Sequence, residues 1–157
     1  MKTLVLGLGN PLLGDDAVGL RVARSLRGRL PPDVELDEDY CGGLRLMERL
    51  AGYDRAVIID ALVTGAHPPG LVLCLRPGEV ETQHSGSTHD VSLSEALRLA
   101  ATLGLRMPRL DLVVIEAGQV LEFDEHLTPA VDAAVPRAAR MVLDLVAAPP
   151  KSAGAAA

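Results

Sequence analysis

The sequence predicts an α/β protein, a three-layer αβα sandwich in which a mainly parallel, twisted sheet of about five strands carries helices on both faces. Two observations support this fold class. Short apolar runs alternate along the chain with longer segments in which apolar residues recur every three or four positions. The chain has 157 residues, 48% of them hydrophobic, which suffices for one domain with its own core.

The first strand is predicted over residues 3–8, where a short apolar run ends in glycines. The first helix is predicted over residues 16–30, with Asp15 as its N-cap and the pair Pro31-Pro32 as its end. Its buried face is expected to consist of Val18, Val22, Leu26 and Leu30.

The remaining elements continue this alternation. Further strands are predicted at residues 34–36, 56–59, 71–75 and 110–115. Further helices are predicted at residues 44–50, at residues 90–103, and from Thr128-Pro129 onward, where an N-cap precedes a proline. Cys74, inside an apolar run, is expected to be a buried thiol. Residues 1–148 form a single predicted domain, and the tail of small residues, 149–157, is predicted to be disordered.

The charge balance bears on the class of partner. The chain has 15 basic and 21 acidic residues, and because nucleic-acid binding needs a basic footprint, no nucleic-acid partner is expected. No apolar run is long enough to span a membrane and the N-terminus lacks signal-peptide features, so a soluble, cytoplasmic protein is expected. A local group of arginines is interpreted as the solvated face of a helix, with a docking patch for an acidic partner as the alternative. The group consists of Arg21, Arg24, Arg27 and Arg29.

A glycine-rich turn between the first strand and the first helix carries the first candidate site. Residues 7–16 read GLGNPLLGDD. A dinucleotide-binding loop would need a third glycine where Leu12 stands, and the adjacent carboxylates of Asp15 and Asp16 would repel a pyrophosphate. The acidic pair favours a cation instead. The alternative for both aspartates is that they cap the helix and complement its dipole, for which one of them suffices.

Two further polar residues are expected at the edge of the sheet where the parallel strands end, which is where ligands bind in such folds. Asp60 follows an apolar strand, and it either projects into a site or forms the next turn. His89 is a candidate metal ligand or general base, with a solvated loop histidine as the alternative and His84 as a competing ligand. Together Asp16, Asp60 and His89 would form a set of two oxygen donors and one nitrogen donor, which suits nickel, zinc or cadmium.

These features in combination resemble the hydrogenase maturation endopeptidases. Members of that family begin with a glycine-x-glycine-asparagine turn, a few apolar residues and an acidic pair before a helix, as residues 7–16 do here. The later sequence is similar too, because Asp60 ends a strand, Thr88-His89 opens a helix and residues 127–129 (Leu-Thr-Pro) start the last helix. The resemblance covers nearly the whole chain except the tail.

The resemblance implies a phosphorylase/hydrolase-like fold and an endopeptidase, classed with the aspartic-type peptidases, that removes the C-terminal extension of a nickel-containing hydrogenase large-subunit precursor. Asp16, Asp60 and His89 match the family's metal ligands, and they are the expected catalytic residues. The implied cofactor is nickel presented by the substrate, with cadmium or zinc able to replace it in vitro. The ion either polarises the scissile carbonyl or serves only for recognition, with Asp16 or Asp60 as the base. The expected partner is the precursor, and the expected state is a monomer or weak oligomer.

Two other functions are compatible with parts of the pattern. A non-catalytic metal- or nucleotide-binding assembly chaperone would share every candidate ligand and leave the precursor uncut. A peptidyl-tRNA hydrolase also begins with Gly-Leu-Gly-Asn-Pro, but it needs a histidine soon afterwards, and the next one here is His67 in an acidic chain. Residues 40–43 (Tyr-Cys-Gly-Gly) depart from the Gly-Gly-Thr common in the endopeptidases, so the resemblance says least about substrate choice.

Overall fold

The computed structural model describes residues 1–40, 44–77 and 88–149 and, for residues 44 and 88–94, the backbone alone. Its strands are β1 (Thr3–Leu8), β2 (Val34–Asp39), β3 (Arg55–Leu62), β4 (Val72–Leu75) and β5 (Arg109–Glu116). Its helices are the 3₁₀ turn η1 (Gly14–Ala17), α1 (Val18–Ser25), α2 (Leu44–Leu50), α3 (Thr88–Thr102) and α4 (Pro129–Ala147).

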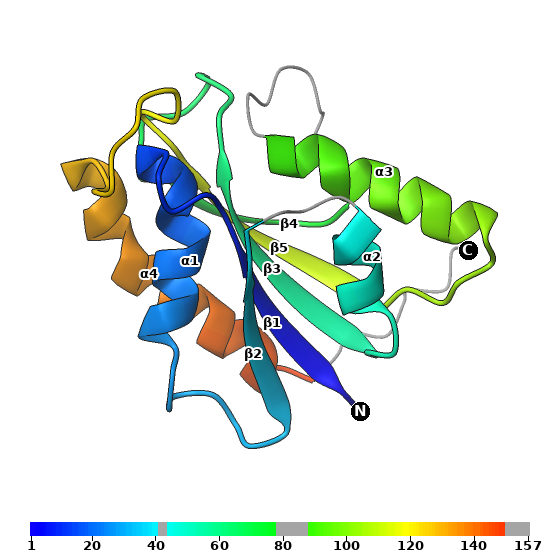
Figure 1. Cartoon of the computed structure of the whole chain (residues 1–157). Coiled ribbons are helices and arrows are strands. Elements are labelled where there is room, and N and C mark those ends of the chain that lie inside the picture. Colours follow the sequence, from blue (N-terminus) through cyan, green and yellow to red (C-terminus); the bar gives the residue numbers. More distant parts are fainter. Residues whose placement is uncertain (41–43, 78–87, 150–157) are drawn as a thin grey trace.

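One five-stranded sheet, in the order β2-β1-β3-β5-β4, forms the middle layer. Strands β1, β2, β3 and β5 are parallel, and β4 is an antiparallel strand at one edge. Helices α1 and α4 cover one face of the sheet, while α2 and α3 cover the other (Figure 1). The predicted three-layer sandwich with a mainly parallel sheet is therefore confirmed.

The central strand β3 is buried along its whole length, as its continuous apolar run requires in a sheet covered on both faces. Its side chains alternate between two cores. Val57 and Ile59 belong to the core beneath α1 and α4, whereas Ile58 and Leu62 belong to the core beneath α2 and α3. Because the alternation has a period of two, Asp60 lies on the same face as Ile58 and Leu62.

Glycines allow the first helix to lie directly on the sheet. A Cβ atom added to Gly19, in α1, would come within 2.3 Å of the carbonyl oxygens of Leu8 and Ile59. A Cβ atom added to Gly7, in β1, would come within 2.5 Å of the carbonyl oxygen of Gly19. These contacts hold the start of α1 against the carboxyl ends of β1 and β3, where ligands bind in folds of this class.

The first helix and the second strand differ from their predicted bounds. The helix begins with the 3₁₀ turn η1 and α1 ends at Ser25, because the chain turns at Gly28, whose φ is +73°. Leu30, predicted on the buried face of that helix, nevertheless packs against the core. Strand β2 extends to Asp39 because it pairs with β1 over its six residues. Pairing with a neighbour thus extended a strand whose charged end gave no apolar signal.

The prediction of a buried thiol at Cys74 is wrong. Cys74 lies in the edge strand β4, and its side chain is exposed. The run from Leu71 to Leu75 is apolar throughout, so the sequence pattern does not distinguish the exposed face of this edge strand from the buried one.

No helix among the described residues is both long and apolar enough to cross a membrane. The predicted disordered tail lies outside the described residues from position 150 onward.

Candidate functional site

Asp16 lies in the turn that follows β1. It is only 4% exposed, and its Oδ2 accepts a hydrogen bond of 2.9 Å from the backbone N–H of Asn10. The absence of a side chain at Gly9 makes this turn possible, since a Cβ atom there would lie 2.3 Å from the carbonyl oxygen of Asp16. The glycine-rich turn singled out from the sequence therefore wraps around the Asp16 backbone and orients its carboxylate.

Asp60 lies in β3, two residues before the strand ends at Leu62. It too is 4% exposed, and its Oδ1 accepts a hydrogen bond of 2.8 Å from the N–H of Ala61. The predicted strand, residues 56–59, is therefore shorter than the observed β3. Side chains alternate between the two faces of a strand, so Asp60, as a residue of β3, projects to the face covered by α2 and α3.

The packing of α1 brings the two elements that carry Asp16 and Asp60 together. Gly19 contacts the carbonyl oxygen of Ile59, the residue immediately before Asp60. Asp16 lies three residues before Gly19, and positions three apart lie on the same side of a helix. Both aspartates therefore lie at the carboxyl ends of neighbouring parallel strands, as the sequence predicted.

His89 is the second residue of α3, but its side chain lies outside the described residues, as does the competing candidate His84. Helix α3 begins at the same end of the molecule as η1 and α1 (Figure 1). It also covers the face on which Asp60 lies. Among the side chains that the structure describes, no group of three or more His, Cys, Asp or Glu residues is arranged to hold a metal ion. The set of Asp16, Asp60 and His89 stays a prediction.

Asp15 does not cap the first helix, which corrects the prediction for this residue. Neither η1 nor α1 has a side-chain hydrogen bond at its N-cap. The Asp15 carboxylate is fully buried and accepts hydrogen bonds from the N–H groups of Gly118 (2.8 Å), Gln119 (3.0 Å) and Thr128 (2.7 Å). The Thr128 hydroxyl also donates to it, at 2.8 Å from Oδ2. Asp15 therefore holds both ends of the segment between β5 and α4.

Two other buried carboxylates at this edge were not identified from the sequence. Glu116 ends β5 opposite Leu62, is 2% exposed, and accepts hydrogen bonds from the N–H and hydroxyl of Thr64. Asp39 ends β2, is also 2% exposed, and its carbonyl oxygen accepts a hydrogen bond from the N–H of Gly9. Each carboxylate ends a strand, which is the signal that identified Asp60. Glu116 anchors the segment after β3 and lies on the same face as Asp60.

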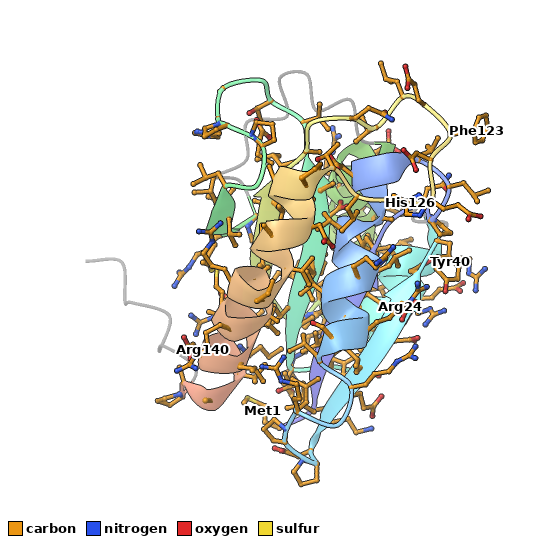
Figure 2. The ribbon with its side chains drawn as sticks, turned by 90° about the vertical axis from the view of Figure 1, so that its left-hand side faces the viewer. Met1, Arg24, Tyr40, Phe123, His126 and Arg140 are labelled. Atoms are coloured by element: carbon orange, nitrogen blue, oxygen red, sulfur yellow. The ribbon has the colours of Figure 1, made fainter. Side chains whose placement is uncertain are left out.

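The four arginines of the predicted helix are exposed, Arg21 and Arg24 on α1 and the other two after it. Exposure fits both the solvated face and the docking patch, so the choice between them stays a prediction. Arg24 and Arg27 bind Glu38 at 2.9 and 3.0 Å, and Arg24 lies beside Tyr40 (Figure 2). Partial burial acts to raise the pKa of Glu38, but hydrogen bonds from Arg24 and Tyr40 and the nearby positive charges outweigh it, so this pKa is lowered. Arg21 and Arg29 donate to the carbonyl oxygens of Glu125 (3.4 Å) and Ser25 (3.3 Å), so each of the four arginines has a partner within the chain.

Comparison with known proteins identifies the family of this chain. The sequence profile described as hydrogenase maturation protease matches residues 20–145. The hydrogenase 2 maturation protease of Escherichia coli (strain K12) is 35% identical over 147 residues, covering 91% of this chain and 89% of the relative. The hydrogenase expression/formation protein HupD of Thiocapsa roseopersicina is 30% identical over 151 residues, covering 93% of this chain and 68% of the relative.

Solved structures agree with the sequence comparison. The hydrogenase maturating endopeptidase HybD from E. coli superposes with a TM-score of 0.83 at 33% identity, covering 94% of this chain and 93% of that one. The [NiFe] hydrogenase maturation protease HybD from Thermococcus kodakarensis superposes with a TM-score of 0.74 at 27% identity, covering 93% of this chain and 99% of that one. The chain therefore belongs to the hydrogenase maturation protease family and is a peptide-bond hydrolase, as its sequence predicted.

Proposed function

We propose that this protease removes the C-terminal extension of a [NiFe] hydrogenase large-subunit precursor after recognising the nickel that the precursor carries. The observation that supports this most directly is the burial of two aspartates, Asp16 and Asp60, on adjoining elements at the carboxyl ends of β1 and β3. Ligands bind at this edge in folds of this class, and two carboxylates held there on adjoining elements supply oxygen donors of the kind that bind a divalent cation.

The donor chemistry fits nickel delivered by the substrate. Carboxylate oxygens from Asp16 and Asp60, with the imidazole of His89, form a mixed oxygen and nitrogen set that suits a borderline divalent ion. The described hydrogen bonds from Asn10 and Ala61 orient the two carboxylates. Three protein ligands leave further positions for groups of the precursor, and cadmium or zinc would occupy the same set in vitro.

In this proposal Asp16, Asp60 and His89 are also the catalytic residues, because they contact the metal centre beside the scissile bond. The nickel of the precursor supplies a positive charge near the cut carbonyl. Asp16 or Asp60 is the group that accepts a proton from the attacking water. A cytoplasmic location and a monomer or weak oligomer stay predictions.

The test is a processing assay on a purified large-subunit precursor from the organism that carries this chain, in nickel-loaded and nickel-free forms. Intact mass spectrometry should detect a shortened product only from the loaded form. Cleavage that ignores nickel would contradict metal recognition. An uncut nickel-loaded precursor, in the presence of protein whose circular dichroism shows it to be folded, would contradict the proposed substrate.

A further inference from the structure

The segment between β5 and α4 exposes large apolar side chains. Within residues 118–127, called the 118–127 loop below, Leu121 is 88% exposed and Phe123, the only phenylalanine of the chain, is 86% exposed. Figure 2 shows Phe123 projecting away from the body of the protein. Leu12, 48% exposed, lies alongside, since its carbonyl oxygen accepts a hydrogen bond from the N–H of Asp124. An isolated exposed apolar residue is ordinary, but a group of them in adjoining segments typically marks a contact surface.

This surface is held in place by hydrogen bonds. The N–H of Gly14 donates to the carbonyl oxygen of Asp124 at 2.8 Å, and the N–H of Asp124 donates to that of Leu12 at 2.9 Å. Within the loop, the side-chain oxygen of Gln119 accepts from the N–H groups of Leu121 (2.7 Å) and Glu122 (2.9 Å). A surface that is ordered before a partner arrives loses little conformational entropy on binding.

The loop is joined directly to the candidate active site. Asp15 receives hydrogen bonds from Gly118 and Gln119 at one end of the loop and from Thr128 just beyond the other end. Asp15 is the neighbour in sequence of Asp16, one of the proposed metal ligands. The loop therefore lies at the end of the sheet where the parallel strands finish (Figure 1).

The charge of the loop is acidic. Glu122, Asp124 and Glu125 are exposed on it, and residues 110–136 contain no lysine or arginine. Arg21 of α1 donates to the carbonyl oxygen of Glu125 at 3.4 Å, so three carboxylates face one described guanidinium. The backbone N–H and then the ring of His126 lower the pKa of Asp124, which keeps this carboxylate ionised. Opposite charge across an interface favours encounter and register, so the complementary partner is basic as well as apolar.

We propose that the 118–127 loop is a docking surface for the protein substrate and binds a segment of it that carries apolar side chains and positive charge. The inference rests on the proposed function, because it identifies the occupant as the hydrogenase precursor. Leu121 and Phe123 supply the apolar contacts, and the acidic residues beside them attract the basic groups.

The test measures KM and kcat for nickel-loaded precursor, together with precursor binding by fluorescence anisotropy. The double variants are Leu121→Ser with Phe123→Ser, and Glu122→Lys with Glu125→Lys. Each should raise KM about tenfold with kcat changed less than about twofold. A tenfold loss of affinity corresponds to about 1.4 kcal/mol, which is of the size expected when a central contact of an interface is removed.

Control variants carry changes of the same kind at the opposite end of the molecule. Leu103 and Leu105, exposed by 58% and 44% after α3, serve for the serine pair, and Asp33, exposed before β2, serves for the lysine exchange. Leu103→Ser with Leu105→Ser, and Asp33→Lys, should leave KM unchanged.

The outcomes separate this inference from the proposed function. Wild-type KM in folded loop variants would overturn the docking surface while leaving the protease function intact. If wild-type protein binds the precursor without cutting it, and the loop variants lose that binding, the docking surface stands and the processing function fails. Wild-type protein that neither binds nor cuts the precursor would overturn both.

Discussion

At the start of the parallel strands the carboxylate of Asp111 is buried against a guanidinium, whereas at their carboxyl ends Asp16 and Asp60 accept hydrogen bonds from backbone N–H groups. Arg55 donates to Asp111 from Nε and Nη2, at 3.2 and 3.0 Å, and its Nη1 donates to the carbonyl oxygen of Ala148. A bound guanidinium neutralises a carboxylate permanently, while a backbone N–H orients it without cancelling its charge. The start of the sheet thus holds a buried ion pair, and its carboxyl end holds the carboxylates that we propose as cation ligands.

The largest expected effect comes from neutralising the carboxylates at the carboxyl end. Asp16→Asn and Asp60→Asn should each reduce processing of the nickel-loaded precursor by about a thousandfold or more, because changes even to outer-shell partners of a metal cost about 10- to 100-fold. The asparagine oxygen can still accept the backbone hydrogen bond, so thermal unfolding should change little. Asp33→Asn, on the exposed turn before β2, is the matched control. Full processing by both site variants would remove them from the catalytic set.

Substitutions at the opposite end of the sheet should change the free energy of unfolding rather than the activity. Arg55→Met leaves the Asp111 carboxylate buried without its guanidinium and should lower the free energy of unfolding by about 3–5 kcal/mol. Adding Asp111→Leu should restore most of that loss, since it removes the stranded charge. Urea denaturation measures both. Processing per folded molecule should match the wild type, and a specific loss of activity in Arg55→Met would contradict the division between the two ends.

A substitution of Asp15 tests whether adjacent aspartates have different roles. Asp15→Asn places an amide where Gly118, Gln119 and Thr128 all donate, so the free energy of unfolding should fall by about 2–3 kcal/mol. Processing should be lost mainly through unfolding and should return at low temperature. An Asp15→Asn protein as stable as the wild type yet inactive would show that Asp15 belongs to the chemistry rather than to the anchoring of the 118–127 loop.

The smallest effect is expected at Glu38, a half-buried carboxylate that pairs with exposed arginines. Its folded-state pKa is lowered, so its contribution is present above the unfolded pKa and lost as pH falls through the folded pKa. Glu38→Gln should therefore destabilise the protein by about 0.2–1 kcal/mol at neutral pH, and the difference from wild type should vanish in acid. Chemical denaturation at several pH values tests this. A difference that grows toward acid would contradict the lowered pKa.

The sequence by itself determined the layers, the buried face of the first helix and the placement of Asp16 and Asp60 at the carboxyl ends of β1 and β3. Periodicity identified the helices because a buried stripe must recur every three to four residues, and the apolar runs identified β1, β3 and β5 because both faces of those strands are covered. The glycines of residues 7–16 indicated a turn that no bulkier side chain permits, which located Asp16. Asp60 was singled out because it follows an apolar strand, although the sequence alone left open whether it projects into a site or forms the next turn.

Only the tertiary structure decided how neighbouring carboxylates divide their roles. Asp15 and Asp16 are identical residues in one turn, and what distinguishes them is a segment about a hundred residues away that supplies N–H donors to Asp15 alone among the described contacts. The pair Arg55 and Asp111 is separated by 56 residues and meets only because β3 and β5 are neighbours. The local sequence pattern predicts which element a residue belongs to and which face it occupies. Its contact partners depend on the order of the strands, which long-range packing sets.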